Sequence, residues 1–404
     1  MSRPEVTAPW PEHRAEDRPE SRGPAPATAE LVAATRSLLG CADVSSRPER
    51  RPAKPGARPG PLPVPGGPQR ASNRPTIEDV ARLAGVSRGT VSRVLNGGRH
   101  VRPALMANVN SAIQALGYSV NQAARSLAAG RTGSVAFVIS EHREHLVEDP
   151  NFGLFVKVFS RELRLRGRHL LVTAAQDQEE ETFLADYLSA GHVDGALLAL
   201  PRMGEPLLAH LADSRLPLVV MGRPLGFDAE LSWVAIDDEA GATEMVAYLL
   251  SQGRSRIASV TGPLNTSSGR DRFEGYRKAT GKGFRASLAA EGDWSLLSGR
   301  VGASHILERH PDIDALFAAS DLMALGAMAA LRQAGRRVPE DVAVAGFDDS
   351  AAATMAEPPL TTMHNPFEES AVEAVNILDD LMDGRADGPR QVVLPTTFVQ
   401  RSSA

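Results

Sequence analysis

The 404-residue chain has little cysteine and no long apolar run. Its single cysteine, Cys41, excludes an intrachain disulfide and is compatible with a reducing compartment. No uninterrupted apolar stretch approaches the ~20 residues that a membrane-spanning helix needs, and the N-terminal residues lack the apolar core of a signal peptide. We therefore expect a cytoplasmic protein without membrane segments.

Recognisable catalytic motifs are also missing. The sequence contains no G-x-S-x-G elbow, no Walker loop, no HExxH motif and no G-x-G-x-x-G after a predicted strand. Its 10 histidines show no metal-ligand spacing, and a lone histidine is more often a surface residue than a base. We expect neither an enzyme nor a need for a metal or other cofactor.

Charge is distributed unevenly along the chain, although the net charge is only −5. Residues 1–72 carry 11 Lys+Arg against 8 Asp+Glu, residues 73–132 carry 8 against 2, and residues 133–404 carry 25 against 39. A basic module attached to an acidic body suits a protein that contacts nucleic-acid phosphates, because those contacts dominate affinity.

The N-terminal 72 residues have the composition of a disordered tail. They hold 14 of the 29 prolines but few large apolar residues, so they cannot bury a core. Within them, residues 29–39 are interpreted as a transient helix. Two explanations of the tail stay open: it adds non-specific attraction to DNA, or translation of the natural protein starts further downstream.

Residues 76–95 have the pattern of two short helices joined by a tight turn. Thr76 and Asp79 form a capping-box pattern, and Gly85 supplies the turn. Helical spacing on one face is kept by Ile77, Val80, Ala81 and Ala84. Ser87 can cap the second helix, which turns Val91, Val94 and Leu95 inward. Its outward residues are Arg88, Gly89, Ser92 and Arg93. The pattern predicts a helix-turn-helix that enters a major groove.

A third helix and a weaker fourth segment follow. Pro103 favours the first helical position, residues 105–116 keep apolar helical spacing, and Gly117 ends the run. Residues 121–128, capped by Asn121, are too few for a stable isolated helix. We expect this hinge segment to fold when a dimer partner and DNA order it.

Over roughly residues 74–404 the chain resembles the LacI/GalR family of bacterial transcription repressors. The resemblance implies that Arg88, Gly89 and Arg93 read bases, and that Leu127 of the hinge inserts into the minor groove. The complete set of expected DNA-contacting residues is Thr76, Ser87, Arg88, Gly89, Thr90, Ser92, Arg93, Asn96, Tyr118, Asn121, Ala124 and Leu127. The chain departs from the family's sequence pattern at Arg102 and at Val120. The contacts of the first region with the DNA backbone, and the conformation of the hinge in the absence of DNA, are therefore less defined.

From residue 133 onward, apolar runs of strand length alternate with helical stretches. The predicted strands are 135–139, 169–172, 195–200, 218–221, 233–236, 256–260, 315–318 and 342–345. Continuous apolar strands separated by helices predict parallel sheets covered on both faces. We expect two lobes, with a ligand cleft beyond the carboxyl ends of their strands.

The family resemblance also implies an effector site in that cleft. It rests on motifs such as residues 270–276, 291–294 and 346–349, and it places the ligand at Phe152, Arg272, Trp294, Asp348, Asn365 and Phe367. An indole can stack on the C–H face of a sugar while charged groups bind its hydroxyls. Two purely structural interpretations stay open: Trp294 belongs to the hydrophobic core, or Arg272 is a surface ion-pair partner. Asp321 is expected to cap the helix that follows it.

The expected architecture is an all-α helix-turn-helix DNA-binding domain followed by an α/β two-lobed, periplasmic-binding-protein-like domain with doubly wound parallel sheets. The predicted boundaries are 1–72 for the disordered tail, 73–118 for the DNA-binding domain, 119–132 for the hinge and 133–404 for the effector-binding and dimerisation domain. We expect a homodimeric repressor of a pseudo-palindromic operator, controlled by a small carbohydrate. Alternatives are a co-repressor-dependent regulator that responds to another metabolite, and a solute-binding protein.

Overall fold

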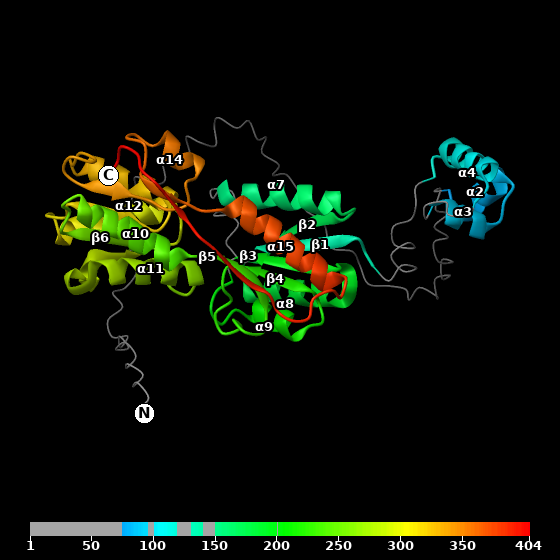
Figure 1. Ribbon diagram of the computed structural model, residues 1–404, viewed down its shortest axis with the longest axis horizontal. Helices are drawn as coiled ribbons and strands as arrows, with labels where there is room; N and C mark the ends of the chain where they lie inside the picture. Colours follow the sequence, from blue (N-terminus) through cyan, green and yellow to red (C-terminus); the bar gives the residue numbers. More distant parts are fainter. Residues whose placement is uncertain (1–74, 96–100, 119–130, 140–149, 200) are drawn as a thin grey trace, which may run out of the picture. The chain divides into compact units, whose positions relative to one another are not determined.

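The computed structural model describes residues 75–95, 101–118, 131–139, 150–199 and 201–404 (Figure 1). The predicted tail, its expected helix at 29–39 and the hinge segment 121–128 lie outside the described residues. Within the described part of the chain, no helix is long and apolar enough to cross a membrane.

Three short helices form the three-helix unit predicted from the sequence: α2 (Ile77–Ala84), α3 (Arg88–Leu95) and α4 (Pro103–Leu116). The Thr76 capping box is present, and Gly85 and Gly117 end α2 and α4 in the left-handed conformation that glycine adopts without strain. The helices share a small core that contains Val80, Val91 and Val109, all fully buried.

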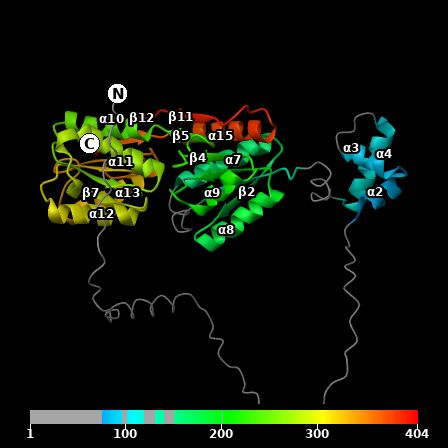
Figure 2. The same cartoon turned by 90° about the horizontal axis from the view of Figure 1, so that it is seen from below.

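The first lobe, called the near lobe, contains a six-stranded parallel sheet in the order β11-β5-β4-β3-β1-β2. Its strands are β1 (Ser134–Ile139), β2 (His169–Ala174), β3 (Gly195–Ala199), β4 (Leu218–Met221), β5 (Ser232–Ile236) and β11 (Gln391–Leu394). On one face pack α7 (Pro150–Leu165) and α15 (Phe367–Met382), and on the other α8 (Gln178–Tyr187) and α9 (Pro206–Asp213) (Figures 1 and 2). A π-helical turn, Leu188–His192, extends α8.

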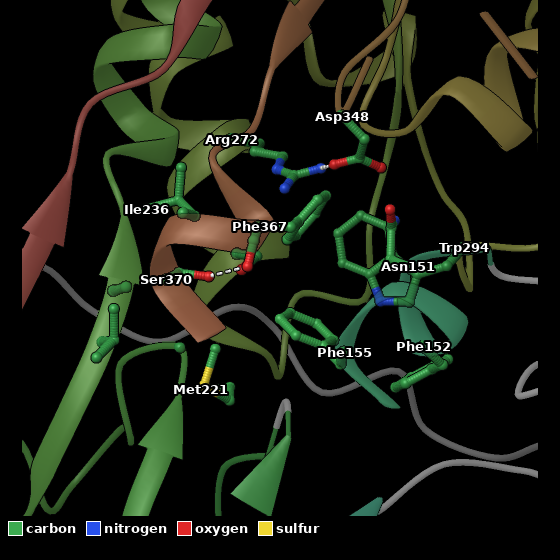
Figure 3. Close-up of a pocket in the computed structure, with 14 residues that line it drawn as sticks. Asn151, Phe152, Phe155, Met221, Ile236, Arg272, Trp294, Asp348, Phe367 and Ser370 are labelled. Atoms are coloured by element: carbon green, nitrogen blue, oxygen red, sulfur yellow. Dashed lines mark hydrogen bonds and ion pairs between the residues drawn. The ribbon is translucent and has the colours of Figure 1, made fainter. Parts of the chain in front are cut away.

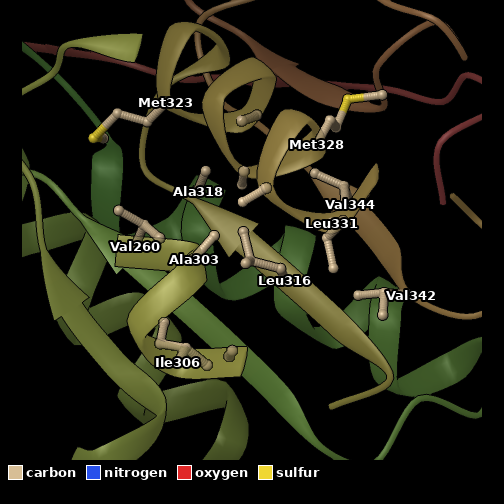
Figure 4. Close-up of a cluster of buried hydrophobic side chains, with 14 of the residues drawn as sticks. Val260, Ala303, Ile306, Leu316, Ala318, Met323, Met328, Leu331, Val342 and Val344 are labelled. Atoms are coloured by element: carbon tan, nitrogen blue, oxygen red, sulfur yellow. The ribbon is translucent and has the colours of Figure 1, made fainter. Parts of the chain in front are cut away.

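The second lobe, called the far lobe, contains a four-stranded parallel sheet in the order β7-β6-β8-β9. The strands are β6 (Ile257–Thr261), β7 (Ala289–Glu291), β8 (Ala315–Ala318) and β9 (Ala343–Ala345). One face carries α12 (Leu296–Arg309), α13 (Asp321–Gln333) and α14 (Ala351–Met355), whose core is drawn in Figure 4. The other face carries α10 (Asp238–Ser251) and α11 (Ser267–Thr280). Two 3₁₀ turns, Gly281–Gly283 and Ala286–Leu288, precede β7.

The chain passes between the lobes three times: after β5, after β10 (Thr362–His364) and after β11. The last passage leads to β12 (Thr397–Val399), which pairs antiparallel with β10. All eight strands predicted from the sequence are present, with ends that differ by one or two residues. The prediction missed β7, β10, β11 and β12, each only three or four residues long.

Candidate DNA-binding surface and ligand pocket

The outer face of α3 presents the residues that the sequence assigns to the major groove. The Ser87 hydroxyl accepts a hydrogen bond from the Thr90 amide at 3.2 Å, which caps the helix as predicted. Arg88, Gly89 and Arg93 are exposed, and Thr90 and Ser92 are half-buried. Tyr118 packs against the small core, and Thr76 is occupied in its capping box. Asn96, Asn121, Ala124 and Leu127 lie outside the described residues.

Arg88 forms an ion pair that sequence reasoning did not find. Its Nη1 lies 3.2 Å from Oε1 of Glu78 on α2, and both side chains are more than half exposed. A pair in this setting contributes about 0–1 kcal/mol, so a DNA base or phosphate can displace Glu78 at little cost.

A pocket lies between the two lobes at the carboxyl ends of their strands. It encloses about 680 Å³ of space, part of it open to solvent. Five of the six predicted ligand residues line it: Phe152, Arg272, Trp294, Asp348 and Phe367 (Figure 3). The other residues that line it are Asn151, Phe155, Met221, Gly222, Val234, Ala235, Ile236, Ser268 and Ser370.

Arg272 is the polar centre of this pocket and is 5% exposed, so it is not a surface ion-pair partner. Its Nε donates to Asp238 at 2.8 Å, and its Nη1 donates to Asp348 at 3.1 Å and to the Ala319 carbonyl at 2.5 Å. Burial raises the pKa of Asp238, and the Arg272 charge opposes that rise. These partners hold the guanidinium in one orientation, which preorganises it for a ligand.

Trp294 has an unusual backbone conformation, and its indole ring fills the space that Gly262, which has no side chain, leaves open. Its φ of 74° lies in the left-handed region that non-glycine residues rarely occupy, as does the φ of 111° at Asp348. A Cβ at Gly262 would lie 2.1 Å from the indole Cη2, so only glycine permits this ring position. Such strain is concentrated at functional sites. Trp294 also packs against the far-lobe core, so the core and pocket interpretations both describe it.

Asn365, which the family resemblance places at the ligand, lies behind the pocket wall. The residue is 2% exposed and is not among those that line the pocket. Its Nδ2 instead donates to Asp348 Oδ1 at 2.8 Å, the same oxygen that accepts from Arg272. Asn365 therefore orients Asp348 from behind, a role that depends on packing between distant segments.

The prediction that Asp321 caps α13 is wrong. Ser320 is the cap, because its hydroxyl accepts from the Met323 amide at 3.2 Å. Asp321 is 1% exposed and accepts from the Thr362 hydroxyl at 2.6 Å and from the Ser350 amide at 2.7 Å. It joins α13 to the loop after β9 and to β10. Burial raises the pKa of Asp321 to about 6.

We expect Asp321→Asn to remove a pH dependence of stability. Because the folded pKa is raised, Asp321 contributes stability that is full below about pH 4 and is lost as the pH rises through about 6. The difference from the ordinary value of 3.8 corresponds to about 3 kcal/mol at most. Urea unfolding between pH 4 and 8 measures it, with the exposed Asp387→Asn as control. Equal slopes in the wild type and Asp321→Asn would contradict this assignment.

Apart from Ser268 of the far lobe, the pocket residues that sequence reasoning missed lie on the near-lobe wall, of which only Phe152 and Phe367 were predicted. It comes from the first turns of α7 and α15 and from the ends of β4 and β5, where Phe155, Met221 and Ile236 lie. These residues belong to apolar runs whose other members are core. Only their place at the carboxyl end of a strand or the start of a helix marks them as pocket residues.

Two family models match this chain, one at the three-helix unit and one at the two-lobed body. The family model of bacterial regulatory proteins, lacI family, matches residues 76–121, and that of a periplasmic binding protein-like domain matches residues 246–404. The HTH-type transcriptional regulator CelR of Thermobifida fusca is 42% identical over 334 residues, 82% of this chain and 98% of that protein. The ribose operon repressor of Escherichia coli strain K12 is 32% identical over 335 residues, 81% and 99% of the two chains.

Solved structures of transcriptional regulators are similar to this chain as well. A transcriptional regulator CelR–cellobiose complex matches with a TM-score of 0.66 and 40% identity, covering 82% of this chain and 100% of its own. The lac repressor dimer bound to operator and the anti-inducer ONPF matches with a TM-score of 0.74 and 28% identity, covering 82% and 99%. Fold and pocket define a transcriptional regulator with a helix-turn-helix domain and a two-lobed, periplasmic-binding-protein-like domain. The chain belongs to the LacI family.

Proposed function

We propose that this chain is a repressor that binds a pseudo-palindromic operator as a homodimer and is released by a small carbohydrate in the interlobe pocket. The observation that carries the proposal is the pocket itself, in which a preorganised Arg272–Asp348 pair faces aromatic rings of both lobes. The similarity to a regulator solved with cellobiose and to a repressor dimer solved on its operator supports it.

The chemistry of the pocket suits a sugar. Trp294 and Phe367 offer faces for the C–H side of a pyranose, as Figure 3 shows. Arg272 Nη2 donates no hydrogen bond to the described residues, so its two N–H groups are available to ligand hydroxyls. We propose Phe152, Arg272, Trp294, Asp348 and Phe367 as ligand contacts, with Asn365 acting through Asp348.

Two exposed apolar surfaces support the homodimer. On the near lobe, large apolar side chains are exposed along the edge strand β2 and the neighbouring α8: Leu171, Val172, Phe183 and Tyr187. On the far lobe they lie on α12: Leu296, Leu297 and Val301. A second copy that covers both surfaces would bury them and pair the open edge of the sheet. Two chains per operator duplex is the stoichiometry that this requires.

Two parallel helices offer a route from the pocket to the hinge. Both α7 and α15 begin at the pocket, at Phe152 and Phe367, and they lie side by side along the near-lobe sheet (Figure 1). Their rings meet at Phe155 and Phe367, 5.6 Å apart, and further along Arg166 Nη2 donates to Asn376 Oδ1 at 2.7 Å. A ligand that moves the first turns displaces both helices together.

The end of the hinge region 119–132 is bonded to the far end of α15 and to the residue before β3. Arg131 Nη1 donates to Asp383 at 2.7 Å, and its Nη2 donates to the Met382 carbonyl at 3.0 Å. The amides of Thr132 and Gly133 donate to Asp194 at 2.6 and 2.8 Å. A shift of α15 therefore pulls on the point where the DNA-binding segment joins the body. We propose that this shift separates the hinge segments of the dimer and disfavours the DNA-bound state.

The DNA-binding part of this proposal is tested at Arg93. Because Arg93 is exposed on the outer face of α3, Arg93→Ala should lose affinity and sequence preference together, by about 1–3 kcal/mol per half-site for a bidentate base contact. Arg82→Ala, an exposed arginine on α2 paired with Asp79, is the matched control. Gel-shift titration on matched and mutated operators measures both. A loss that is equal on every sequence would make Arg93 a phosphate contact.

A further inference from the structure

Arg168 lies in the tight turn between α7 and β2, at the end of the near lobe where the chain enters from the hinge region. Gly167 ends α7 in the left-handed conformation, with a φ of 70°, and the Arg168 amide donates to the Leu163 carbonyl at 2.9 Å. The side chain of Arg168 is only 10% exposed. A charge that is so far removed from water requires charged or hydrogen-bonding partners, and these partners show what the turn connects.

The guanidinium of Arg168 forms ion pairs with three carboxylates. Its Nη2 donates to Asp379 Oδ1 at 3.0 Å and lies 3.6 Å from Asp383 Oδ1, both at the end of α15. Its Nη1 lies 3.7 Å from Oδ2 of Asp194, the residue before β3. Because both nitrogens belong to one rigid planar group, Arg168 holds the end of α15 at a fixed distance from Asp194.

Asp194 in turn holds the entry segment, residues 131–133, through which the chain passes from the hinge region into β1. Its Oδ1 accepts from the Thr132 amide at 2.6 Å and from the Thr132 hydroxyl at 3.0 Å. Its Oδ2, the oxygen that faces Arg168, accepts from the Gly133 amide at 2.8 Å. A movement of Arg168 therefore reaches two consecutive backbone amides of the entry segment.

The direct connection from α15 to the entry segment, through Arg131, is the weaker of the two. Arg131 is paired with Asp383, but its side chain is 51% exposed. Water and salt screen a pair in that setting, so it contributes little. Removing one member of a pair that is shielded from water is far more costly, because no solvent replaces the lost charge. Arg168 should therefore carry more of the connection than Arg131.

We propose that Arg168 is a positioning residue for regulation: it joins the end of α15 to Asp194, so that a displacement of α15 moves the entry segment. Both α7 and α15 begin at the pocket, and Arg168 acts at their other end, away from the residues that line the pocket. This inference rests on the proposed function, in which α15 carries the effect of the ligand. It adds the residue on which that transmission depends.

Hydrogen exchange of the full-length protein, measured by mass spectrometry, tests the connection without any ligand. Arg168→Met keeps an unbranched side chain and removes the charge. The peptide that contains the Thr132 and Gly133 amides is expected to exchange about 2- to 10-fold faster, which is the effect of weakening one hydrogen bond. A far-lobe peptide over β6 should exchange as in the wild type.

Arg168→Lys keeps the comparison informative if Arg168→Met folds poorly. Its ammonium retains the positive charge, but one nitrogen cannot bind Asp194 and Asp379 as the two nitrogens of the guanidinium do. Exchange of the entry segment should therefore rise in Arg168→Lys as well, and by less than in Arg168→Met.

Gel-shift titration of operator DNA with and without cellobiose tests the transmission. The ratio of the two dissociation constants is expected to be smaller in Arg168→Met than in the wild type by about threefold or more. Calorimetry without DNA should give a cellobiose affinity within about twofold of the wild type, because the pocket is intact.

The matched control is Arg385→Met. Arg385 is also paired with Asp379 and Asp383, but it is 51% exposed and none of its ion pairs is with Asp194. Arg385→Met should keep the wild-type exchange of the entry segment and the wild-type ratio.

The outcomes separate this inference from the function on which it rests. A wild-type ratio in Arg168→Met, wild-type exchange in both Arg168 variants, or an equal loss in Arg385→Met overturns the inference. Exchange that rises equally in the far-lobe peptide makes Arg168 a purely structural residue and overturns it as well. If cellobiose does not change the operator affinity of the wild type, the proposed function is contradicted, and the transmission falls with it.

Discussion

Replacing Arg272 by alanine is expected to abolish the effect of any sugar on DNA binding while leaving operator affinity in the absence of sugar nearly unchanged. The guanidinium is held by Asp238, Asp348 and the Ala319 carbonyl, and its remaining nitrogen is available to the ligand. The substitution removes that donor and lets Asp348 move. Gel-shift titration with and without cellobiose measures the effect. A variant that still responds to the sugar as the wild type does would show that the pocket is misassigned.

The same substitution should also destabilise the far lobe, for a separate physical reason. Removing one partner of a buried ion pair leaves Asp238 and Asp348 uncompensated, which costs about 3–5 kcal/mol. Because burial raises the pKa of Asp238, the deficit should shrink as the pH falls and the carboxyl is protonated. Urea unfolding at pH 7 and pH 5 measures this.

Two further variants keep loss of response distinct from loss of fold. Arg277→Ala, on the same helix but half-exposed and paired with Glu274, should cost about 0–1 kcal/mol and leave the response intact. Trp294→Ala leaves the hydrogen bonds of Arg272 in place and should still weaken the response. A response that survives in Trp294→Ala would contradict the stacking role of the indole.

Leu127→Ala is expected to weaken operator binding about tenfold to a hundredfold and to reduce the bend of the duplex. The helix predicted over residues 121–128 has only eight residues, with apolar Leu127 near its end, and a helix of that length would have no core of its own to bury a leucine. Wedging a leucine between base steps costs unstacking, which is offset only when the duplex bends and contacts more protein.

Circular-permutation gel shifts measure affinity and bend angle together. Leu165→Ala, which removes an exposed leucine at the end of α7, is the control and should change neither. Sugar affinity of Leu127→Ala should equal that of the wild type. If the bend angle and the affinity stay the same in Leu127→Ala, the leucine is ordinary linker packing and the signal reaches DNA by another route.

Much of the fold could be predicted because its signals are local. The capping box at Thr76, the left-handed Gly85 and the apolar spacing of α2 to α4 are each readable from a few neighbouring residues. The long apolar strands were equally clear. In contrast, β7 and β12 are short and are extended only because their neighbours hold them, so no local pattern marks them.

The site was predictable only in part, for a related reason. Arg272, Trp294 and Asp348 stand in family motifs, whereas Met221 and Ile236 look like any core residue until the second lobe is in place. The role of Asn365 behind Asp348 depends on a contact across 17 residues, and that of Asp321 on one across 41. Contacts of this kind have no signature in sequence spacing.

The central claim is that one chain couples sequence-specific DNA binding to occupancy of the interlobe pocket. Fluorescence anisotropy of the full-length protein, on a duplex selected from random sequence, tests it with cellobiose as the ligand. The account predicts an inverted repeat, two chains per duplex, and an affinity that falls about 5- to 150-fold when the pocket is saturated. It would be contradicted by binding without sequence preference, by an affinity that the sugar does not change, or by an affinity that the sugar raises.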